Sequence, residues 1–120
     1  MEFWFSEEHT PNVKFTIRVD RQLYSGKSEY QRTLDGFMML TEKDEFIYHE
    51  MITHVPMAVH PRVRDVLVIG AGDGGVVREL TRYSDIEHID MVEIDPLVVE
   101  VCRKYLPQTA CRLDDPRLSI

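Results

Sequence analysis

The sequence is short of positive charge: its 120 residues carry 14 lysines and arginines against 21 aspartates and glutamates, a net charge of −7. Nucleic acids and anionic membranes are bound by positive surfaces, so this balance argues against both partners and suits a small cationic ligand. No apolar run approaches the roughly 20 residues needed to cross a bilayer. Cysteine is scarce too, and we expect Cys102 and Cys111 to be reduced thiols in a cytoplasmic protein.

Glycine is also scarce, with six residues, yet four of them fall between positions 70 and 75. The apolar run Val66–Ile69 precedes this turn and predicts a strand buried on both faces. Residues 76–80 then form an amphipathic pattern, and a second strand is expected over Ile89–Ile94. This order is one βαβ unit with a glycine loop at the N-terminus of its helix, which predicts a nucleotide or nucleoside site.

The two acids of this unit decide which ligand suits it. A dinucleotide would place its pyrophosphate at the helix N-terminus, where the carboxylate of Asp73 would repel it. A sulfonium or an ammonium would be attracted instead. Glu93, twenty residues further on, can accept hydrogen bonds from both ribose hydroxyls of an adenosine. The site therefore favours a sulfonium nucleoside of the S-adenosylmethionine type over NAD.

The segment before residue 42 predicts a small antiparallel β module. Residues Asn12–Asp20 alternate between apolar and polar side chains, as a half-buried strand does, and we expect Glu29–Arg32 to pair back. A module of this size cannot hold a core alone. We expect it to pack on the next domain or on another subunit.

A connecting helix is expected after residues 41–44, and Pro56 should bend or end it. His49 and His54 within it superficially resemble a zinc-protease helix. Zinc-binding histidines in that motif are four residues apart, whereas these are five apart, about 100° further round the helix. We therefore expect no metal site.

The remaining residues continue the alternation of helix and strand. Asp95-Pro96 opens a helix, and Arg117–Ile120 reads as the start of a third strand. We predict an α/β protein in which residues 1–41 form a small antiparallel β domain. Residues 42–120 would form the connecting helix and the first part of a Rossmann-like nucleoside-binding domain. A sheet of two or three strands leaves a wide apolar face and an open edge, so we expect this chain to be truncated.

Six segments, taken in order, resemble the spermidine synthases, the polyamine aminopropyltransferases: Tyr30–Gln31, Leu34–Gly36, Thr41–Met51, His54–Pro56, Gly70–Gly75 and Glu93–Asp95. The resemblance implies a methyltransferase-type Rossmann-like domain after the β domain. It also implies a reaction in which the amine of putrescine attacks the aminopropyl carbon of decarboxylated S-adenosylmethionine, giving spermidine and methylthioadenosine. No metal and no permanently bound cofactor would be needed, and a homodimer or homotetramer is expected.

The resemblance further implies roles for individual residues. The co-substrate decarboxylated S-adenosylmethionine would be bound by four residues: Gln31, Gly70, Gly72 and Glu93. Asp73 would hold an ammonium of the substrates, His49 would line the putrescine end, and Tyr48 would help to orient the attacking amine. The family's catalytic aspartate lies beyond Ile120, so the chain alone is expected to be inactive.

Two departures from the family pattern accompany these roles. Only Arg32 and Thr33 separate Gln31 from Leu34, where family members usually carry a further strand pair, and Ala71 replaces a common glycine. Two other functions stay open at this point. The chain could be a non-catalytic oligomerisation or binding fragment, or part of an S-adenosylmethionine-dependent amine N-methyltransferase on the same fold.

Overall fold

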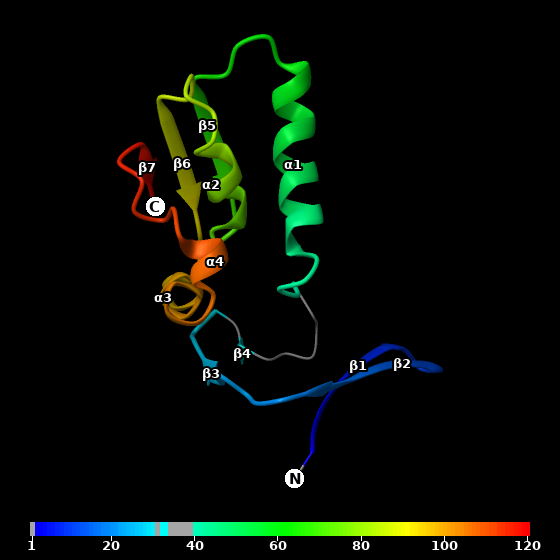
Figure 1. Cartoon of the computed structure of the whole chain (residues 1–120). Helices are drawn as coiled ribbons and strands as arrows, with labels where there is room; N and C mark the ends of the chain where they lie inside the picture. Colours follow the sequence, from blue (N-terminus) through cyan, green and yellow to red (C-terminus); the bar gives the residue numbers. More distant parts are fainter. Residues whose placement is uncertain (1, 31, 34–39) are drawn as a thin grey trace. The chain divides into compact units, whose positions relative to one another are not determined.

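The computed structural model describes residues 2–30, 32–33 and 40–120 (Figure 1). Its contacts divide the chain into two compact units, Met1–Thr41 and Glu42–Ile120, and each is described by itself below. Gln31, expected to bind the nucleoside, lies outside the described residues, so its role stays a prediction.

The first unit is built on an antiparallel hairpin. Strand β1 (Phe3–Thr10) pairs with β2 (Val13–Val19), and a shorter pair joins β3 (Gly26–Lys27) to β4 (Arg32–Thr33). Arg32 of the segment expected to pair back does so, with Lys27 of β3 as its partner. Strand β1 was not predicted because its aromatic and acidic residues do not alternate with a period of two.

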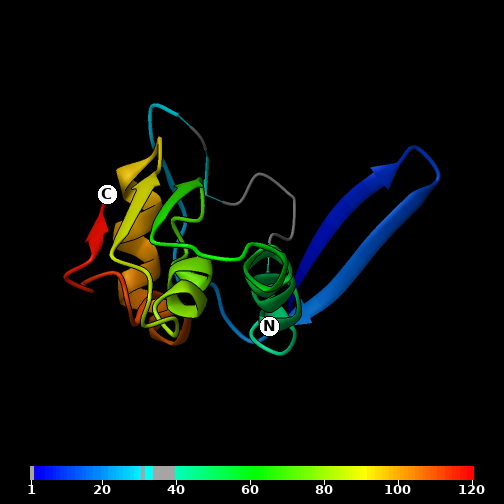
Figure 2. The ribbon, with the colours of Figure 1, turned by 90° about the horizontal axis from the view of Figure 1, so that it is seen from above.

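The second unit contains a parallel sheet in the order β5-β6-β7, formed by Asp65–Ile69, His88–Val92 and Leu118–Ser119 (Figure 2). Helix α2 (Gly75–Leu80) connects the first two strands, which confirms the predicted βαβ unit. Helices α3 (Pro96–Tyr105) and α4 (Pro107–Ala110) lie at the carboxyl end of the strands (Figure 1). Asp95 caps α3 by accepting from the Leu97 N–H at 3.0 Å, as the Asp-Pro pair predicted.

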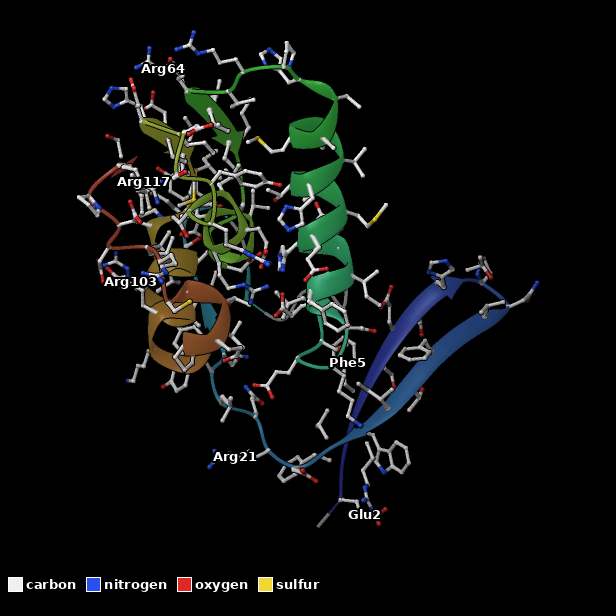
Figure 3. The ribbon with its side chains drawn as sticks, turned by 45° about the horizontal axis from the view of Figure 1, so that its top comes forward. Glu2, Phe5, Arg21, Arg64, Arg103 and Arg117 are labelled. Atoms are coloured by element: carbon white, nitrogen blue, oxygen red, sulfur yellow. The ribbon has the colours of Figure 1, made fainter. Side chains whose placement is uncertain are left out.

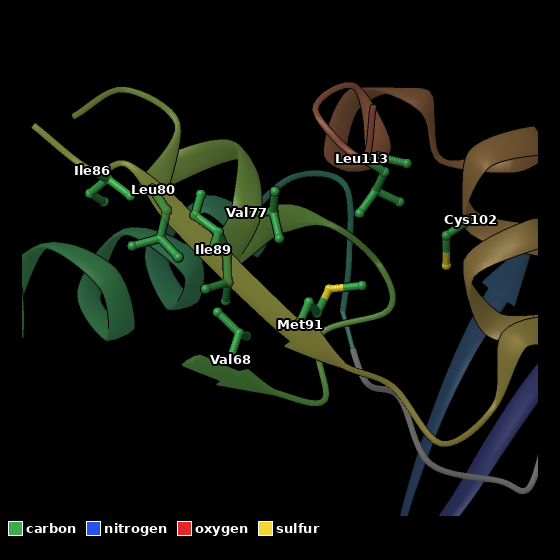
Figure 4. Packing of buried hydrophobic residues seen from close by; sticks show 10 residues of the cluster. Val68, Val77, Leu80, Ile86, Ile89, Met91, Cys102 and Leu113 are labelled. Atoms are coloured by element: carbon green, nitrogen blue, oxygen red, sulfur yellow. The ribbon is translucent and has the colours of Figure 1, made fainter. Parts of the chain in front are cut away.

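The hydrophobic core lies between one face of this sheet and helix α2. Val77 of α2 points toward Ile89 and Met91 of β6, and Val68 of β5 joins them (Figure 4). The opposite face of the sheet is uncovered, with Leu67 63% and Ile69 82% exposed. The prediction that β5 is buried on both faces is thus wrong, whereas a wide apolar sheet face was expected and is present.

Helix α1 (Glu45–Val59) packs against α2 with its polar side. Its buried residues are Glu45, His49 and Thr53, which stand four residues apart on one face. Five of its apolar residues are 45–61% exposed: Phe46, Ile47, Met51, Ile52 and Val55. Pro56 does not end the helix, which continues to Val59. Among the described residues, no helix is long and apolar enough to cross a membrane.

Arg117, labelled in Figure 3, links the end of the chain to the turn after α2. Its guanidinium donates to the carbonyl oxygens of Thr81 at 2.9 Å, Tyr83 at 2.9 Å and Ile86 at 3.3 Å. It also donates to the carboxylate of Asp115, and this contact lowers the pKa of Asp115. One side chain thus satisfies three carbonyls that precede strand β6.

We predict that Arg117→Lys destabilises the protein, because a lysine ammonium cannot reproduce the planar fork that reaches these carbonyls. The expected loss is about 1–3 kcal/mol of unfolding free energy, since buried acceptors would lose their donors. Urea denaturation measures it, with Arg112→Lys at an exposed position as the matched control. Equal midpoints for the two variants would contradict this role of Arg117.

Candidate functional site

The glycine loop owes its shape to left-handed backbone conformations. Gly70 has φ +83°, Gly74 has φ +85°, and Ala71 between them has φ +70°. The Gly70 N–H donates to the Val92 carbonyl at 2.8 Å, which ties the loop to the end of β6. Ala71, where the family has a common glycine, adopts a conformation that costs an L-residue about 1–2 kcal/mol.

Asp73 is fixed in the loop through one carboxylate oxygen. Its Oδ1 accepts from the Gly75 N–H at 2.6 Å and lies 3.3 Å from Nε2 of His49. No hydrogen bond or ion pair from the described residues reaches Oδ2, and the side chain is 23% exposed. Asp73 therefore has an oxygen that can accept from a ligand cation.

Glu93 lies just beyond β6 and faces the loop. Its Oε2 accepts from the Gly72 N–H and its Oε1 accepts from the Asp95 N–H, both at 3.1 Å. A Cβ at Gly72 would lie 2.8 Å from Oε2 of Glu93, so only glycine permits this approach. Each carboxylate oxygen keeps a lone pair for a ligand hydroxyl.

His49 lies under the loop, not on the surface. Its side chain is only 2% exposed, with Nδ1 2.5 Å from Oε2 of Glu45 and Nε2 facing Asp73. The ring packs so closely on Gly75 that a Cβ there would come within 2.3 Å of it. The structure therefore brings His49 and Asp73 together, although the two residues are far apart in sequence.

Arg78 and Glu45 join His49 and Asp73 in one cluster of polar side chains, and neither Arg78 nor Glu45 was predicted from the sequence. The guanidinium of Arg78 donates to both carboxylate oxygens of Glu45, at 2.8 and 3.0 Å. These hydrogen bonds outweigh burial and lower the pKa of Glu45, and the same pair raises the pKa of Arg78. A polar stripe of Glu45, His49 and Thr53 at four-residue spacing was the signal that could have revealed the cluster.

Glu79 extends the cluster along α2. Burial raises its pKa, but hydrogen bonds from Arg82 and Arg78 outweigh this and lower it. Both ring nitrogens of His54 are hydrogen-bonded: Nε2 lies 3.2 Å from Oε2 of Glu79, and Nδ1 lies 2.7 Å from the hydroxyl oxygen of Tyr83. His49 and His54 thus face different partners, and no group of three potential metal ligands occurs among the described residues.

Tyr48 stands apart from these contacts. Its side chain is 62% exposed and touches the neighbouring His49 ring edge-on, with centroids 5.4 Å apart. Within the described part of the chain it has no hydrogen-bond partner. Its proposed role in orienting an amine stays a prediction.

Cys102 of α3 lies close to the two acids of the loop region. Burial, together with the charges of Asp73 and Glu93, raises the pKa of this thiol to about 11. Both Cys102 and Cys111 are free, Cys102 is buried and Cys111 is exposed. Burial is the larger cause of this shift, and the negative charges of Asp73 and Glu93, which add to it, also favour a cation at the loop.

Chemically, the loop offers two carboxylates with different surroundings. Asp73 can accept from a cationic group, and Glu93 can accept from vicinal hydroxyls. Both lie beyond the carboxyl ends of parallel strands, where open α/β sheets bind their ligands. The geometry suits a cationic nucleoside.

Two family models match the chain. The one described as "Spermine/spermidine synthase domain" matches residues 45–120, and the one described as "Spermidine synthase tetramerisation domain" matches residues 3–42.

Among curated proteins, a polyamine aminopropyltransferase of Clostridium perfringens (strain SM101 / Type A) is 66% identical over all of this chain and 47% of its own length. One from Alkaliphilus oremlandii is 63% identical with the same coverage. This chain therefore spans about half the length of the relatives it matches. Each alignment covers 133 positions, more than the 120 residues here, so the relatives carry residues without a counterpart in this chain.

Solved structures agree with the curated relatives. A spermidine synthase from Thermotoga maritima superposes with a TM-score of 0.93 at 45% identity, over 98% of this chain and 46% of that chain. A spermidine synthase in complex with the transition-state analogue AdoDATO gives the same values. The predicted Rossmann-like fold and the family resemblance are both confirmed.

We predict that Gly75→Ala destabilises the protein, because the added methyl group would collide with the buried His49 ring. Overpacking of this kind costs about 1–3 kcal/mol, which chemical denaturation measures. Ala71→Gly in the same loop is the control, since a left-handed φ suits glycine and no loss is expected. If the two variants lost stability equally, the contact with His49 would not explain Gly75.

We predict that only one thiol per folded chain reacts rapidly with iodoacetamide at pH 8. Cys102 is buried and almost entirely protonated at that pH, because its pKa is about 11, whereas Cys111 is exposed. Cys111→Ser should abolish the fast labelling, and Cys102→Ser should leave it unchanged. Intact-mass measurements before and after unfolding give the count, and fast labelling that survives Cys111→Ser would contradict the assignment.

Proposed function

This chain belongs to the spermine/spermidine synthase family, and on that premise we propose that it contributes to an aminopropyltransferase. The proposed reaction moves the aminopropyl group of decarboxylated S-adenosylmethionine to putrescine, giving spermidine and methylthioadenosine. The activity proposed is that of a protein of the relatives' full length, since this chain matches 47% of it.

The observation that carries the proposal is the Asp73 carboxylate held inside the glycine loop with one oxygen uncommitted among the described residues. A pyrophosphate would be repelled there, whereas the ammonium of an amine substrate would form an ion pair. Glu93, anchored by the N–H groups of Gly72 and Asp95, would accept from the ribose of the nucleoside. Gly70 and Gly72 would let the backbone approach it.

The reaction is a displacement at carbon and makes limited chemical demands. The amine lone pair forms the new C–N bond while the C–S bond breaks, and its electrons pass to sulfur, which leaves as a neutral thioether. Because an ammonium has no free lone pair, the attacking nitrogen must give up one proton to a base before it attacks. Alignment of amine and sulfonium could supply much of the rate, so residues that bind and orient matter most. Tyr48, His49 and Gln31 are proposed for these tasks, and no metal is required.

We also propose a homodimer or homotetramer assembled through the β1–β2 hairpin. The matching family domain is described as a tetramerisation domain. The hairpin exposes four large apolar side chains that another subunit could cover: Phe3, Trp4, Val13 and Phe15. A cytoplasmic location is proposed because both cysteines are free.

We predict that Asp73→Asn abolishes most aminopropyl transfer in the intact, relative-length protein. Loss of a partly buried charge pair costs about 2–5 kcal/mol, or roughly 30-fold to more than 1,000-fold. Steady-state assays with putrescine and decarboxylated S-adenosylmethionine measure this, with Asp85→Asn at an exposed position as the control. Wild-type rates in Asp73→Asn would overturn the assignment.

The same assay separates the other functions. Mass identification of a methylated amine, with S-adenosylmethionine as donor, would instead support an N-methyltransferase. A stable oligomer that neither turns over nor binds methylthioadenosine in calorimetry would support a non-catalytic module.

A further inference from the structure

A continuous series of buried polar contacts runs from α2 through α1 to the glycine loop. It starts at Arg78, whose guanidinium donates to both carboxylate oxygens of Glu45. It continues through the 2.5 Å contact between Oε2 of Glu45 and Nδ1 of His49. It ends where Nε2 of His49 lies 3.3 Å from Oδ1 of Asp73. The side chains of Glu45 and His49 are 7% and 2% exposed, so water does not replace these contacts.

The order of charges along this series determines how the His49 ring is held. Glu45 is an acceptor only, because its pairing with Arg78 keeps it ionised. Nδ1 of His49 must therefore donate to it, which fixes a proton on that nitrogen. Nε2 faces the carboxylate of Asp73, and since Nδ1 already carries a proton, this contact is an ion pair of the imidazolium, in which both nitrogens are donors. These two contacts thereby fix the plane of the His49 ring and the directions in which its two nitrogens point.

This arrangement acts on one oxygen of Asp73. Oδ1 receives the Gly75 N–H at 2.6 Å and faces His49, whereas Oδ2 has no such partner among the described residues. A carboxylate held through one oxygen keeps the other in a fixed direction, so less conformational entropy is lost when a ligand binds. Nothing else that the structure describes touches Oδ1.

We propose that Glu45 and Arg78 are positioning residues: they hold His49 so that it clamps Oδ1 of Asp73 and leaves Oδ2 directed at the ammonium of a substrate. This inference rests on the proposed function, because it takes Asp73 to be the ammonium-binding residue. Neither Glu45 nor Arg78 touches the substrate; both act through His49. The partners that orient metal-ligating histidines change affinity or activity by about 10–100-fold when removed, and we expect an effect at the lower end of that range here.

Glu79 provides a matched control. It is as buried as Glu45, with side-chain exposures of 5% and 7%, and it also pairs with Arg78. Its other partners are Arg82 and His54, so it has no contact with His49 or Asp73. A general weakening of the α1–α2 packing would affect Glu45→Gln and Glu79→Gln alike, whereas the proposed role distinguishes them.

The kinetic experiment uses the intact protein of the relatives' length. Glu45→Gln should raise KM about 10-fold for whichever substrate, putrescine or decarboxylated S-adenosylmethionine, has its KM raised by Asp73→Asn. Glu79→Gln should change that KM less than twofold, even where thermal unfolding shows a comparable loss of stability. An equal effect of the two glutamate variants, or an unchanged KM in Glu45→Gln, would overturn the proposal.

A second readout does not depend on activity. In nitrogen-15 spectra of the folded chain at neutral pH, the Nδ1–H signal of His49 should be present in the wild type and in Glu79→Gln. It should be lost in Glu45→Gln, because the carboxylate that accepts from Nδ1 is gone and the ring proton then lies on Nε2, which faces the carboxylate of Asp73. Persistence of the signal in Glu45→Gln would overturn the proposal.

The two readouts also separate this inference from the proposed function. If Asp73→Asn leaves both KM values unchanged while the Nδ1–H signal behaves as expected, the substrate assignment fails and the clamp on His49 stands. Should Glu45→Gln not fold, Arg78→Lys takes its place. Arg78→Lys keeps the positive charge but loses the contact with both oxygens of Glu45. A rise in the same KM, smaller than the one expected for Glu45→Gln, supports the proposal, and an unchanged KM overturns it.

Discussion

The ion pair between Arg78 and Glu45 is the contact on which the second unit depends. It joins α1 to α2 through two hydrogen bonds, with the Glu45 side chain 7% and the Arg78 side chain 19% exposed. The pair dictates which side of α1 faces inward. Once Glu45 and His49 turn toward α2, the apolar residues of the helix must face outward. The position of the His49 ring, and with it the glycine at position 75, follows from the same contact.

Local sequence signals predicted the parts of the fold that depend on local physics. The parallel strands, helix α2 and the Asp95 cap follow from apolar runs, glycines and an Asp-Pro pair, all within a few residues. Strand β1 and the inward side of α1 could not be predicted in this way. Strand β1 lacks a period-two pattern although its partner β2 follows after only two residues. The inward side of α1 depends on Arg78, 33 residues from Glu45, and an apolar stripe is the wrong guide when ion pairs occupy the interface.

The candidate site likewise has residues that local sequence signals predicted and features that they did not. Asp73 and Glu93 were identified because acids at a glycine loop and after a strand carry a chemical meaning on their own. His49 was identified through the family resemblance, but its burial was not, since a histidine on a helix gives no sign of what packs over it. Tyr48, adjacent in sequence, is exposed, and this contrast arises because successive helical residues point about 100° apart.

The outward apolar residues of α1 and the uncovered sheet face have a consequence for how the chain behaves in solution. Leu67, Ile69 and Val92 present an apolar face on one side of the sheet, and electrostatic repulsion between copies opposes the association of such faces. That repulsion comes from a net charge of −7, which vanishes near the isoelectric point of about 5.1. Mild acid, by lowering the net charge, or concentrated salt, by screening it, therefore weakens the repulsion between copies of this chain.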